Sequence, residues 1–335
     1  MNLAAVRAAA AAQRARVTPG IEDMGRYLES QVADVSHREV IGPALPGSGA
    51  SGVVVFRGER VASWGDPEVP EMAFSATKSV VSTVAGLAFD AGLIPDVHQP
   101  VTDTLDMPEL DGPSAITWHH LLQQTSQWDG ELWGKPAWAD AGSLGPGSAP
   151  PDAPPGAGWA YNDVRVNLLC LALTRLFGRS LPSVLRDGVL GPMGASATWS
   201  WHGYRGATTD IDGEAVPVVS GGAHWGGGLW ISAGDLALLG SLYLRDGEHH
   251  GRRLLSREWI DRTWSPCAHN PDYGYLWWLN DRRRVFPAAP PSGRCARGNG
   301  GRHLLWVDPG RDLVIVSRWG EDAGRLLHEV SAAIS

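Results

Sequence analysis

The chain has 335 residues, of which 43% are hydrophobic and 19% are charged, so it contains enough apolar material for a large core. No apolar run reaches the roughly 18 residues that a membrane-spanning helix needs. The net charge of −8 without a basic block argues against a nucleic-acid partner or an anionic membrane.

The N-terminal residues 1–20 are rich in alanine but are interrupted by Arg7, Arg14 and Arg16. A signal peptide needs an unbroken apolar stretch, so we expect an Ala-rich helix instead. The three cysteines, Cys170, Cys267 and Cys295, have neither the number nor the spacing of a disulfide framework or a metal site. We therefore expect a cytoplasmic protein without a bound metal.

A hairpin is predicted next, because residues 52–56 and 61–64 are rich in apolar residues and are separated by a turn at 57–60. A helix is expected from about Thr77 to Ala91, where the apolar residues follow helical spacing and Gly92 follows as a stop signal. Residues 117–123 read as a short helix.

The middle of the chain contains a Gly/Pro-rich stretch at 141–158, which predicts a surface loop or the border of a lid. Helices are expected over Val164–Phe177 and from an N-cap at Ser232 to about Leu244, and Tyr273–Leu279 reads as a strand. Cys170 falls in the first of these helices and is predicted to be a core residue.

The C-terminal part predicts a second hairpin, with strands at 303–307 and 313–317, followed by an amphipathic helix over about 321–333. Strands at both chain ends with helices between them indicate an α/β (α+β) fold, in which one antiparallel sheet carries an inserted, mainly helical lobe. We expect a single domain, 1–335, with an α/β lobe at about 20–75 and 265–335 and a helical lobe at about 76–264.

The string Phe74-Ser-Ala-Thr-Lys78 is the first chemical signal. Lys78 and Lys135 are the only two lysines in the chain. Residues i and i+3 of a helix share a face, so Lys78 can reach the hydroxyl of Ser75, and free N–H groups at a helix N-terminus can stabilise an oxyanion. A serine needs such a partner to take its proton. The alternative is an N-capping serine followed by a solvated lysine.

Two further segments carry weaker signals. Tyr161 and Asp163 lie between the Gly/Pro-rich loop and a helix, a place where a tyrosine can face a cleft; the alternative is a packing tyrosine with Asp163 as the N-cap. The glycine-rich run 295–301 precedes a strand and can bring backbone N–H groups close to a ligand; the alternative is a tight entry to an edge strand.

Taken in this order, the three segments resemble the class C β-lactamase and penicillin-binding-protein superfamily, and most closely its esterase and nylon-oligomer (6-aminohexanoate-dimer) hydrolase branch, over about residues 50–320. The resemblance implies a β-lactamase/transpeptidase-like fold. It implies Ser75 as the acylated nucleophile, Lys78 as its proton partner and Tyr161 as general base and then acid. The N–H groups of Ser75 and Asn299 would form the oxyanion hole. It also implies a small ester or amide as substrate, and no cofactor.

The chain departs from the family pattern twice. The family often has Tyr-x-Asn where Asp163 stands here, and a carboxylate near Lys78 would favour the charged amine and shift the role of base to Tyr161. The β-lactamases carry Lys-Thr-Gly where this chain has Ala296-Arg297-Gly298. The cation and hydroxyl that hold a β-lactam carboxylate are missing at these positions, which favours uncharged esters or amides over β-lactams; Arg297 is the candidate substitute for the cation.

Residues Trp128, Trp225 and His224 lie in loop-like stretches and are predicted to line the cleft. An α/β-hydrolase or a zinc hydrolase would need Gly-x-Ser-x-Gly or His-Glu-x-x-His, and neither string occurs. An amidase or peptidase, a β-lactamase or DD-peptidase-like enzyme, and a non-catalytic acyl-binding sensor remain as alternatives. The sequence does not determine the oligomeric state.

Overall fold

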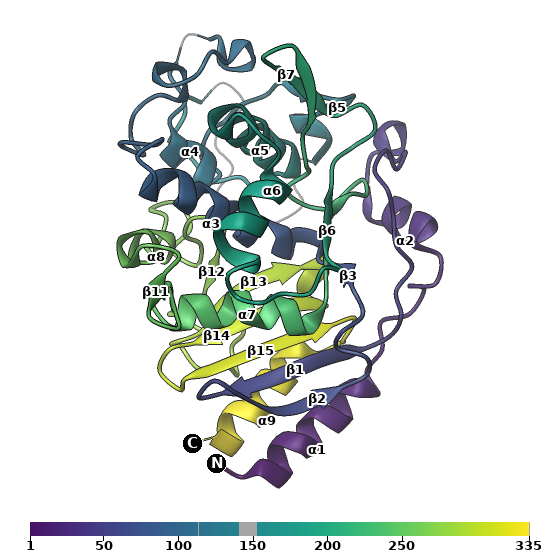
Figure 1. The fold of residues 1–335 in the computed structure, drawn as a ribbon. Helices are drawn as coiled ribbons and strands as arrows, with labels where there is room; N and C mark the ends of the chain where they lie inside the picture. Colours follow the sequence, from purple (N-terminus) through teal and green to yellow (C-terminus); the bar gives the residue numbers. More distant parts are fainter. Residues whose placement is uncertain (113, 141–152, 335) are drawn as a thin grey trace.

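The computed structural model describes residues 1–112, 114–140 and 153–334. Its main sheet is antiparallel and has the strand order β12-β13-β14-β15-β1-β2 (Figure 1). The strands are β1 (Ser51–Phe56), β2 (Glu59–Trp64), β12 (Trp278–Leu279), β13 (Arg294–Gly298), β14 (His303–Asp308) and β15 (Leu313–Arg318). Strands β1 and β15 are neighbours, with Val54 opposite Ile315. The prediction that both chain ends build one sheet is therefore confirmed.

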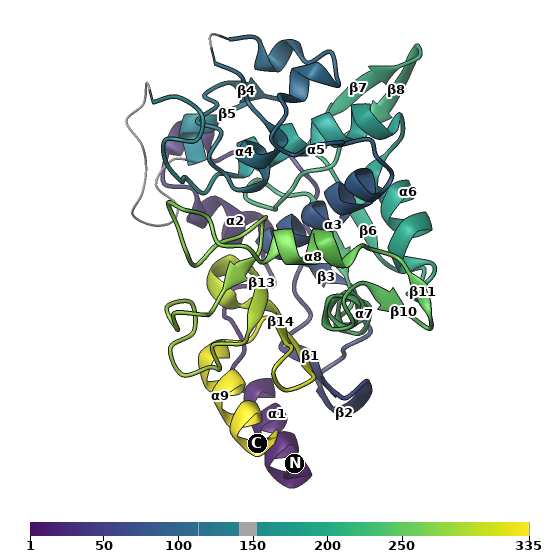
Figure 2. The same ribbon diagram turned by 90° about the vertical axis from the view of Figure 1, so that its left-hand side faces the viewer.

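Helices cover both faces of this sheet. On one face, α1 (Leu3–Arg14) packs against α9 (Ala323–Ile334), and the N–H of Asn2 donates to the carbonyl oxygen of Ala333, so the two termini lie together (Figure 2). On the other face, α7 (Ala233–Leu244) packs against β14, β15 and β1. Alternate residues of each strand point to opposite faces, and strands that are covered on both sides are largely apolar. Strands β14 and β15 are buried along their whole length and are apolar at residues 304–307 and 313–316. The helix α7 thus joins the sheet, although it lies within the stretch expected to form the helical lobe.

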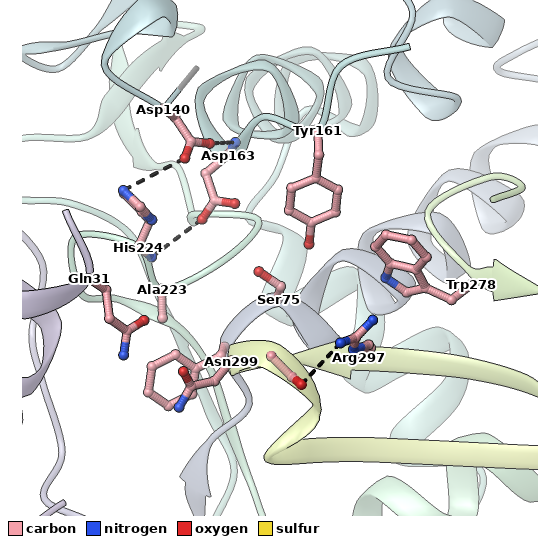
Figure 3. Close-up of a pocket in the computed structure, with 12 residues that line it drawn as sticks. Gln31, Ser75, Asp140, Tyr161, Asp163, Ala223, His224, Trp278, Arg297 and Asn299 are labelled. Carbon is pink, nitrogen blue, oxygen red and sulfur yellow. Dashed lines mark hydrogen bonds and ion pairs between the residues drawn. The ribbon is translucent and has the colours of Figure 1, made fainter. Parts of the chain in front are cut away.

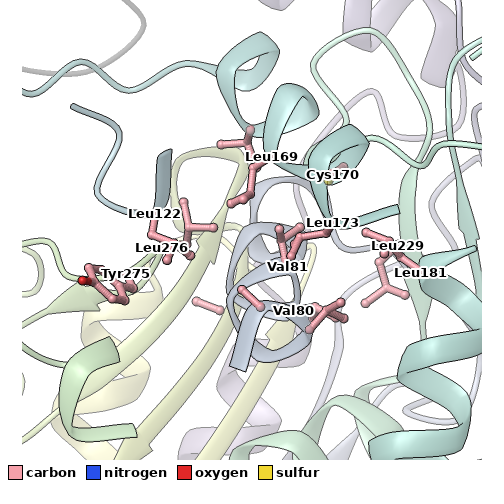
Figure 4. Close-up of a cluster of buried hydrophobic side chains, with 14 of the residues drawn as sticks. Val80, Val81, Leu122, Leu169, Cys170, Leu173, Leu181, Leu229, Tyr275 and Leu276 are labelled. Atoms are coloured by element: carbon pink, nitrogen blue, oxygen red, sulfur yellow. The ribbon is translucent and has the colours of Figure 1, made fainter. Parts of the chain in front are cut away.

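The helical part is built around α3 (Thr77–Asp90), which packs against α5 (Asp163–Phe177), α6 (Leu181–Leu185) and α8 (Arg257–Thr263). Val80 and Val81 of α3 meet Leu169 and Leu173 of α5 in this core (Figure 4). Cys170 is fully buried there, as predicted. A helix that is buried on nearly all sides holds its polar residues rigidly, and α3 is the helix that carries Lys78.

The remaining helices and strands are short. They are α2 (Met24–Gln31), α4 (Trp118–Leu122), β3 (Glu71–Met72), β4 (Glu131–Leu132), β5 (Lys135–Pro136), β6 (Ser200–His202), β7 (Thr208–Ile211), β8 (Glu214–Pro217), β9 (Gly228–Ile231), β10 (Glu248–His249) and β11 (Arg252–Arg253). Single helical turns occur at Val35–His37, Phe74–Ala76, Val101–Asp103, Pro108–Leu110, Ala137–Asp140, Arg186–Leu190 and Asn299–Gly301.

The strands β3, β9 and β6 form a second, three-stranded sheet that leads the chain into the segment of Ser75. A fully buried arginine, Arg318, joins this sheet to the main one by donating to the carbonyl oxygens of Ile231 and Glu71 at 2.7 and 2.6 Å. Glu71 in turn accepts a hydrogen bond of 2.8 Å from the Trp319 indole. The backbone just before Ser75 is therefore anchored to the main sheet.

One predicted strand is mostly wrong. Of Tyr273–Leu279, only Trp278 and Leu279 pair with β13. The N–H of Gly274 donates to the carbonyl oxygen of Trp277 and Leu276 has a φ of +60°, so the chain turns back on itself before β12. The aromatic residues that suggested a strand are instead buried by side-chain packing, which a short periodic pattern does not distinguish from strand pairing.

Of the Gly/Pro-rich stretch 141–158, residues 141–152 lie outside the described residues. Gly156, in the described remainder, donates its N–H to the carbonyl oxygen of Thr125 at 2.7 Å. Within the described ranges, no single helix has both the length and the apolar character to cross a membrane. One bent pair, Asp163–Phe177 with Leu181–Leu190, meets these criteria only when its two helices are combined.

Candidate active site

Ser75 lies in the turn Phe74–Ala76, immediately before α3 rather than inside its first turn. Phe74 has a φ of +50°, a left-handed conformation that is costly for a residue with a side chain. The Phe74 ring packs against His303 and Trp319, with centroids 4.8 and 5.3 Å away. Core packing therefore holds the strained turn that presents Ser75.

Lys78 is buried, with 1% of its surface exposed. Its Nζ donates to Ser75 Oγ at 3.0 Å and also to Asp163 Oδ1. Burial by itself lowers the pKa of Lys78, but the negative charge and hydrogen bond of Asp163, together with Tyr161 and Asp140, outweigh this effect and the net pKa is raised. The alternative of a solvated lysine is therefore wrong, and the amine is charged in the resting protein.

Tyr161 faces the same two groups. Its ring centroid lies 4.7 Å from Lys78 Nζ, and its hydroxyl points toward Ser75 (Figure 3). Burial raises the pKa of Tyr161, and the positive charge of Lys78 and the hydrogen-bonding contacts with Ser75 and Lys78 only partly offset this. The resting side chain is therefore a neutral phenol.

Asp163 is the first residue of α5, and the N-cap is Asn162, whose side chain accepts from the Arg165 N–H at 3.0 Å. The alternative in which Asp163 caps this helix is therefore wrong. Burial raises the pKa of Asp163, but the charge and hydrogen bond of Lys78, together with His224, outweigh this effect, so the net pKa is lowered and the carboxylate is ionised. The Asp163 carboxylate belongs to the site and not to the helix end.

The opposite wall of the pocket comes from the end of β13 and the turn that follows. A Cβ on Gly298 would lie 2.5 Å from the carbonyl oxygen of Ala73, so glycine lets this strand pass directly beside the Ser75 turn. Asn299 follows with a φ of +49°, and its side chain donates to Tyr27 Oη at 2.6 Å. This places Asn299 beside the nucleophile, and its role in an oxyanion hole stays a prediction.

Arg297 lies on the same wall, and Nη2 donates to the carbonyl oxygen of Gly300 at 3.1 Å. Its guanidinium lies 5.8 Å from the Trp278 ring and 5.6 Å from the Phe286 ring. The aromatic contacts hold the guanidinium at the pocket, where it supplies a fixed positive charge.

These groups surround a pocket of about 280 Å³, the size of a small-molecule site. The lining residues are Gln31, Phe74, Ser75, Asp140, Tyr161, Asp163, Ala223, His224, Trp278, Arg297, Asn299 and Gly300. Ser75, Tyr161, Asp163, His224, Arg297 and Asn299 were all predicted as site residues. The structure brings them together from segments far apart in the sequence.

Two predicted lining residues lie elsewhere. Trp128 donates its indole N–H to the carbonyl oxygen of Glu109, and the buried Trp225 donates to that of His37, each at 2.7 Å. Trp225 is buried, Trp128 is half-buried against the core, and neither contributes to the pocket lining. Loop position alone did not distinguish an indole that binds the backbone from one that faces a cleft.

Six lining residues were not predicted as site residues from the sequence: Gln31, Phe74, Asp140, Ala223, Trp278 and Gly300. Gln31 comes from α2 and Asp140 from an isolated turn, and neither lies in a recognisable motif. Trp278 had a usable signal, because it lies in the aromatic run that was read only as a strand. Among the described residues, no cluster of three or more His, Cys, Asp or Glu side chains has a metal-binding arrangement.

Comparison with known proteins gives a consistent result. A family model described as Beta-lactamase matches residues 44–317. The 6-aminohexanoate-dimer hydrolase of Paenarthrobacter ureafaciens is 26% identical over 310 residues, which cover 80% of this chain and 71% of that protein.

Solved structures share the fold. A penicillin-binding protein homolog from Caulobacter crescentus has a TM-score of 0.61 at 19% identity and covers 95% of this chain and 98% of that chain. A D-stereospecific amidohydrolase from Streptomyces has a TM-score of 0.58 at 17% identity, with coverages of 90% and 96%. The β-lactamase/transpeptidase-like fold implied by the sequence is therefore confirmed.

Proposed function

The chain belongs to the beta-lactamase family and is a hydrolase, and from this premise we propose that it cleaves a carboxylic ester or amide through an acyl-enzyme on Ser75. The observation that carries the proposal is the 3.0 Å hydrogen bond from Lys78 Nζ to Ser75 Oγ. This bond lies beside a pocket that Tyr161 also lines. A serine becomes a nucleophile when a neighbour takes its proton, and Tyr161 is placed to do so while the ammonium of Lys78 stabilises its phenolate.

The charges around Lys78 indicate which group moves which proton. Asp163 holds Lys78 as an ammonium, so the proton lost in the reactive form of the site comes from the Tyr161 phenol, and the ammonium stabilises the resulting phenolate. The phenolate takes the Ser75 proton while Oγ bonds to the carbonyl carbon. Tyr161 then returns that proton to the leaving alkoxide or amine as its bond to the acyl carbon breaks. Water repeats the cycle and releases the acid from Ser75.

Developing negative charge on the carbonyl oxygen needs donors close to Ser75. The N–H groups of Ser75 and Asn299 are the candidates, because Gly298 brings this part of the chain against the Ser75 turn. Two such donors typically contribute several kcal/mol to the barrier reduction.

A small, uncharged ester is the favoured substrate class, because the pocket is small and lacks the Lys-Thr-Gly string of the β-lactamases. Amides are the second candidate. Two of the similar proteins, a 6-aminohexanoate-dimer hydrolase and a D-stereospecific amidohydrolase, favour amides. Parallel assays on a p-nitrophenyl ester and the matching p-nitroanilide separate the two candidates.

The direct test is mass spectrometry after treatment with a fluorophosphonate probe. We expect one adduct, on Ser75, and loss of both labelling and p-nitrophenyl acetate hydrolysis in Ser75→Ala. Ser63→Ala is the matched control, because Ser63 is an exposed serine on β2. An adduct on another residue contradicts the proposal. Labelling of Ser75 without release of product would favour the acyl-binding sensor.

A further inference from the structure

The proposed steps leave one buried acid of the pocket unused. Asp140 ends the turn Ala137–Asp140, its side chain is 2% exposed, and it lines the pocket. Its Oδ2 accepts a hydrogen bond from the N–H of Asp163, the residue whose carboxylate pairs with Lys78. Asp140 therefore fixes the backbone of the group that holds the catalytic amine.

His224 closes a ring of contacts with these two acids. Its backbone N–H donates to Asp163 Oδ2 at 3.3 Å, and its Nε2 lies 3.7 Å from Asp140 Oδ1 (Figure 3). The loop of His224 can approach this closely because residue 222 is glycine. A Cβ there would overlap Asp163 Oδ2 and lie 2.9 Å from Lys78 Nζ. The site therefore holds two buried carboxyl groups, Asp140 and Asp163, although the ion pair with Lys78 uses only that of Asp163.

The charge balance identifies what the second carboxylate does. Two ionised carboxylates and one ammonium leave a net charge of −1 in a buried site, which is costly unless another proton is held nearby. Asp140, the second buried carboxyl group of this ring, can hold it. The pKa of Asp140 is raised to about 6, because burial and the negative charge of Asp163 raise it more than His224, Lys78 and the hydrogen bond from the Asp163 N–H lower it.

The other charged and titratable groups around this ring lie on neighbouring elements. The charge of Asp140 also acts on Arg165 of α5 and on Tyr204. The His224 ring packs edge-on against Trp225 at 4.4 Å, and Lys135 lies 5.0 Å from that indole. Lys78, which pairs with Asp163, also acts on Asp140 and lowers its pKa.

We propose that Asp140 is a positioning residue that holds one proton beside the Lys78–Asp163 ion pair, with His224 packed next to its carboxyl group. This proton makes the ionisation of the Lys78–Tyr161 pair, and hence the rate, depend on pH below neutrality. This inference rests on the proposed function of Ser75. When the proton leaves Asp140, the added negative charge makes the Lys78–Tyr161 pair harder to deprotonate. The pH dependence of the rate then has an inflection between about pH 5 and 7.

The experiment measures kcat/KM for p-nitrophenyl acetate from pH 4.5 to 10 on the full chain. Asp140→Asn keeps the shape and an acceptor for the Asp163 N–H but not the charge, so the inflection should disappear. The alkaline limb should also move to lower pH, by less than in Asp163→Asn, because Asp140 raises the pKa of Lys78 less than Asp163 does. His224→Gln should move the inflection to higher pH by about one unit, because His224 lowers the pKa of Asp140.

Asp235→Asn is the matched control, since Asp235 is a buried acid that accepts hydrogen bonds from Ser196 and does not line the pocket. It should keep the wild-type profile. Labelling of Ser75 by the fluorophosphonate probe is measured in parallel. If Ser75 is labelled but the Asp140→Asn variant keeps the wild-type inflection, this inference alone is overturned. If the wild-type protein is neither labelled nor active, the proposed function is overturned and the inference falls with it. If Asp140→Asn does not fold, the His224→Gln profile decides.

Discussion

The two lysines of this chain have similar surroundings and different tasks. Lys78 and Lys135 are 1% and 3% exposed, and each ammonium lies over an aromatic ring, Tyr161 at 4.7 Å and Trp225 at 5.0 Å. Burial and an aromatic contact therefore do not distinguish Lys78, the lysine of the proposed mechanism, from Lys135.

The acceptors distinguish them. Lys135 donates to the carbonyl oxygens of His37 and Glu39, both at 2.9 Å, and ties that N-terminal segment to β5. Lys78 donates to a carboxylate and to the Ser75 hydroxyl. Accordingly, burial lowers the pKa of Lys135, while Asp163 raises that of Lys78. A buried lysine is structural where it binds the backbone, and it is available for proton transfer where it binds ionisable or nucleophilic side chains.

The sharpest test of this difference removes each amine. Lys78→Ala should lower kcat/KM for p-nitrophenyl acetate by at least roughly a thousandfold, because Ser75 loses its proton partner. Lys135→Ala, the matched control, should stay within about threefold of the wild type per folded molecule, because Lys135 does not line the pocket. Equal losses in the two variants would remove the distinction.

The pH dependence gives the next largest effect. The pKa values of both Lys78 and Tyr161 are raised, and the reactive form has one proton fewer than the resting form. Above pH 7, kcat/KM should rise by about tenfold for each pH unit until the protein unfolds or the pair has titrated. A profile that is flat from pH 7 to 10 would show that the resting protein already holds the active form.

Replacing the counter-charge should shift that profile. In Asp163→Asn, Lys78 loses the carboxylate that raises its pKa, so the rising limb should move to lower pH by about one unit or more. The variant must be compared at temperatures well below its unfolding midpoint, because breaking a buried ion pair also destabilises the protein. An unshifted limb would mean that the proton lost on activation does not come from the Lys78–Tyr161 pair.

The smallest expected effect concerns stability. Lys135→Met should reduce the free energy of unfolding by about 1–3 kcal/mol, because the carbonyl oxygens of His37 and Glu39 lose their buried donor. Urea denaturation followed by tryptophan fluorescence measures this. A more stable variant would show that the unfavourable free energy of burying the Lys135 ammonium exceeds the stabilisation from its two hydrogen bonds.

Much of the fold could be predicted because its signals are local. The hairpins at both chain ends and the helices α3, α5, α7 and α9 follow periodic apolar patterns with turn or cap residues at their ends. The strand expected at Tyr273–Leu279 was mostly wrong because a compact aromatic turn and a strand have similar composition.

For the site, the sequence by itself determined the spacing of Ser75 and Lys78, since residues three apart at a helix start share a face. It also indicated that Tyr161, Asp163, Arg297 and Asn299 come from segments that can border a cleft. Only the tertiary structure decided that Asp140 and His224 both contact Asp163. It also decided that the Trp128 and Trp225 indoles bind backbone carbonyl oxygens outside the pocket lining, and that a carboxylate beside Lys78 raises the pKa of its amine. These outcomes depend on distances between residues far apart in the chain and on the burial of charge, and no local pattern encodes either quantity.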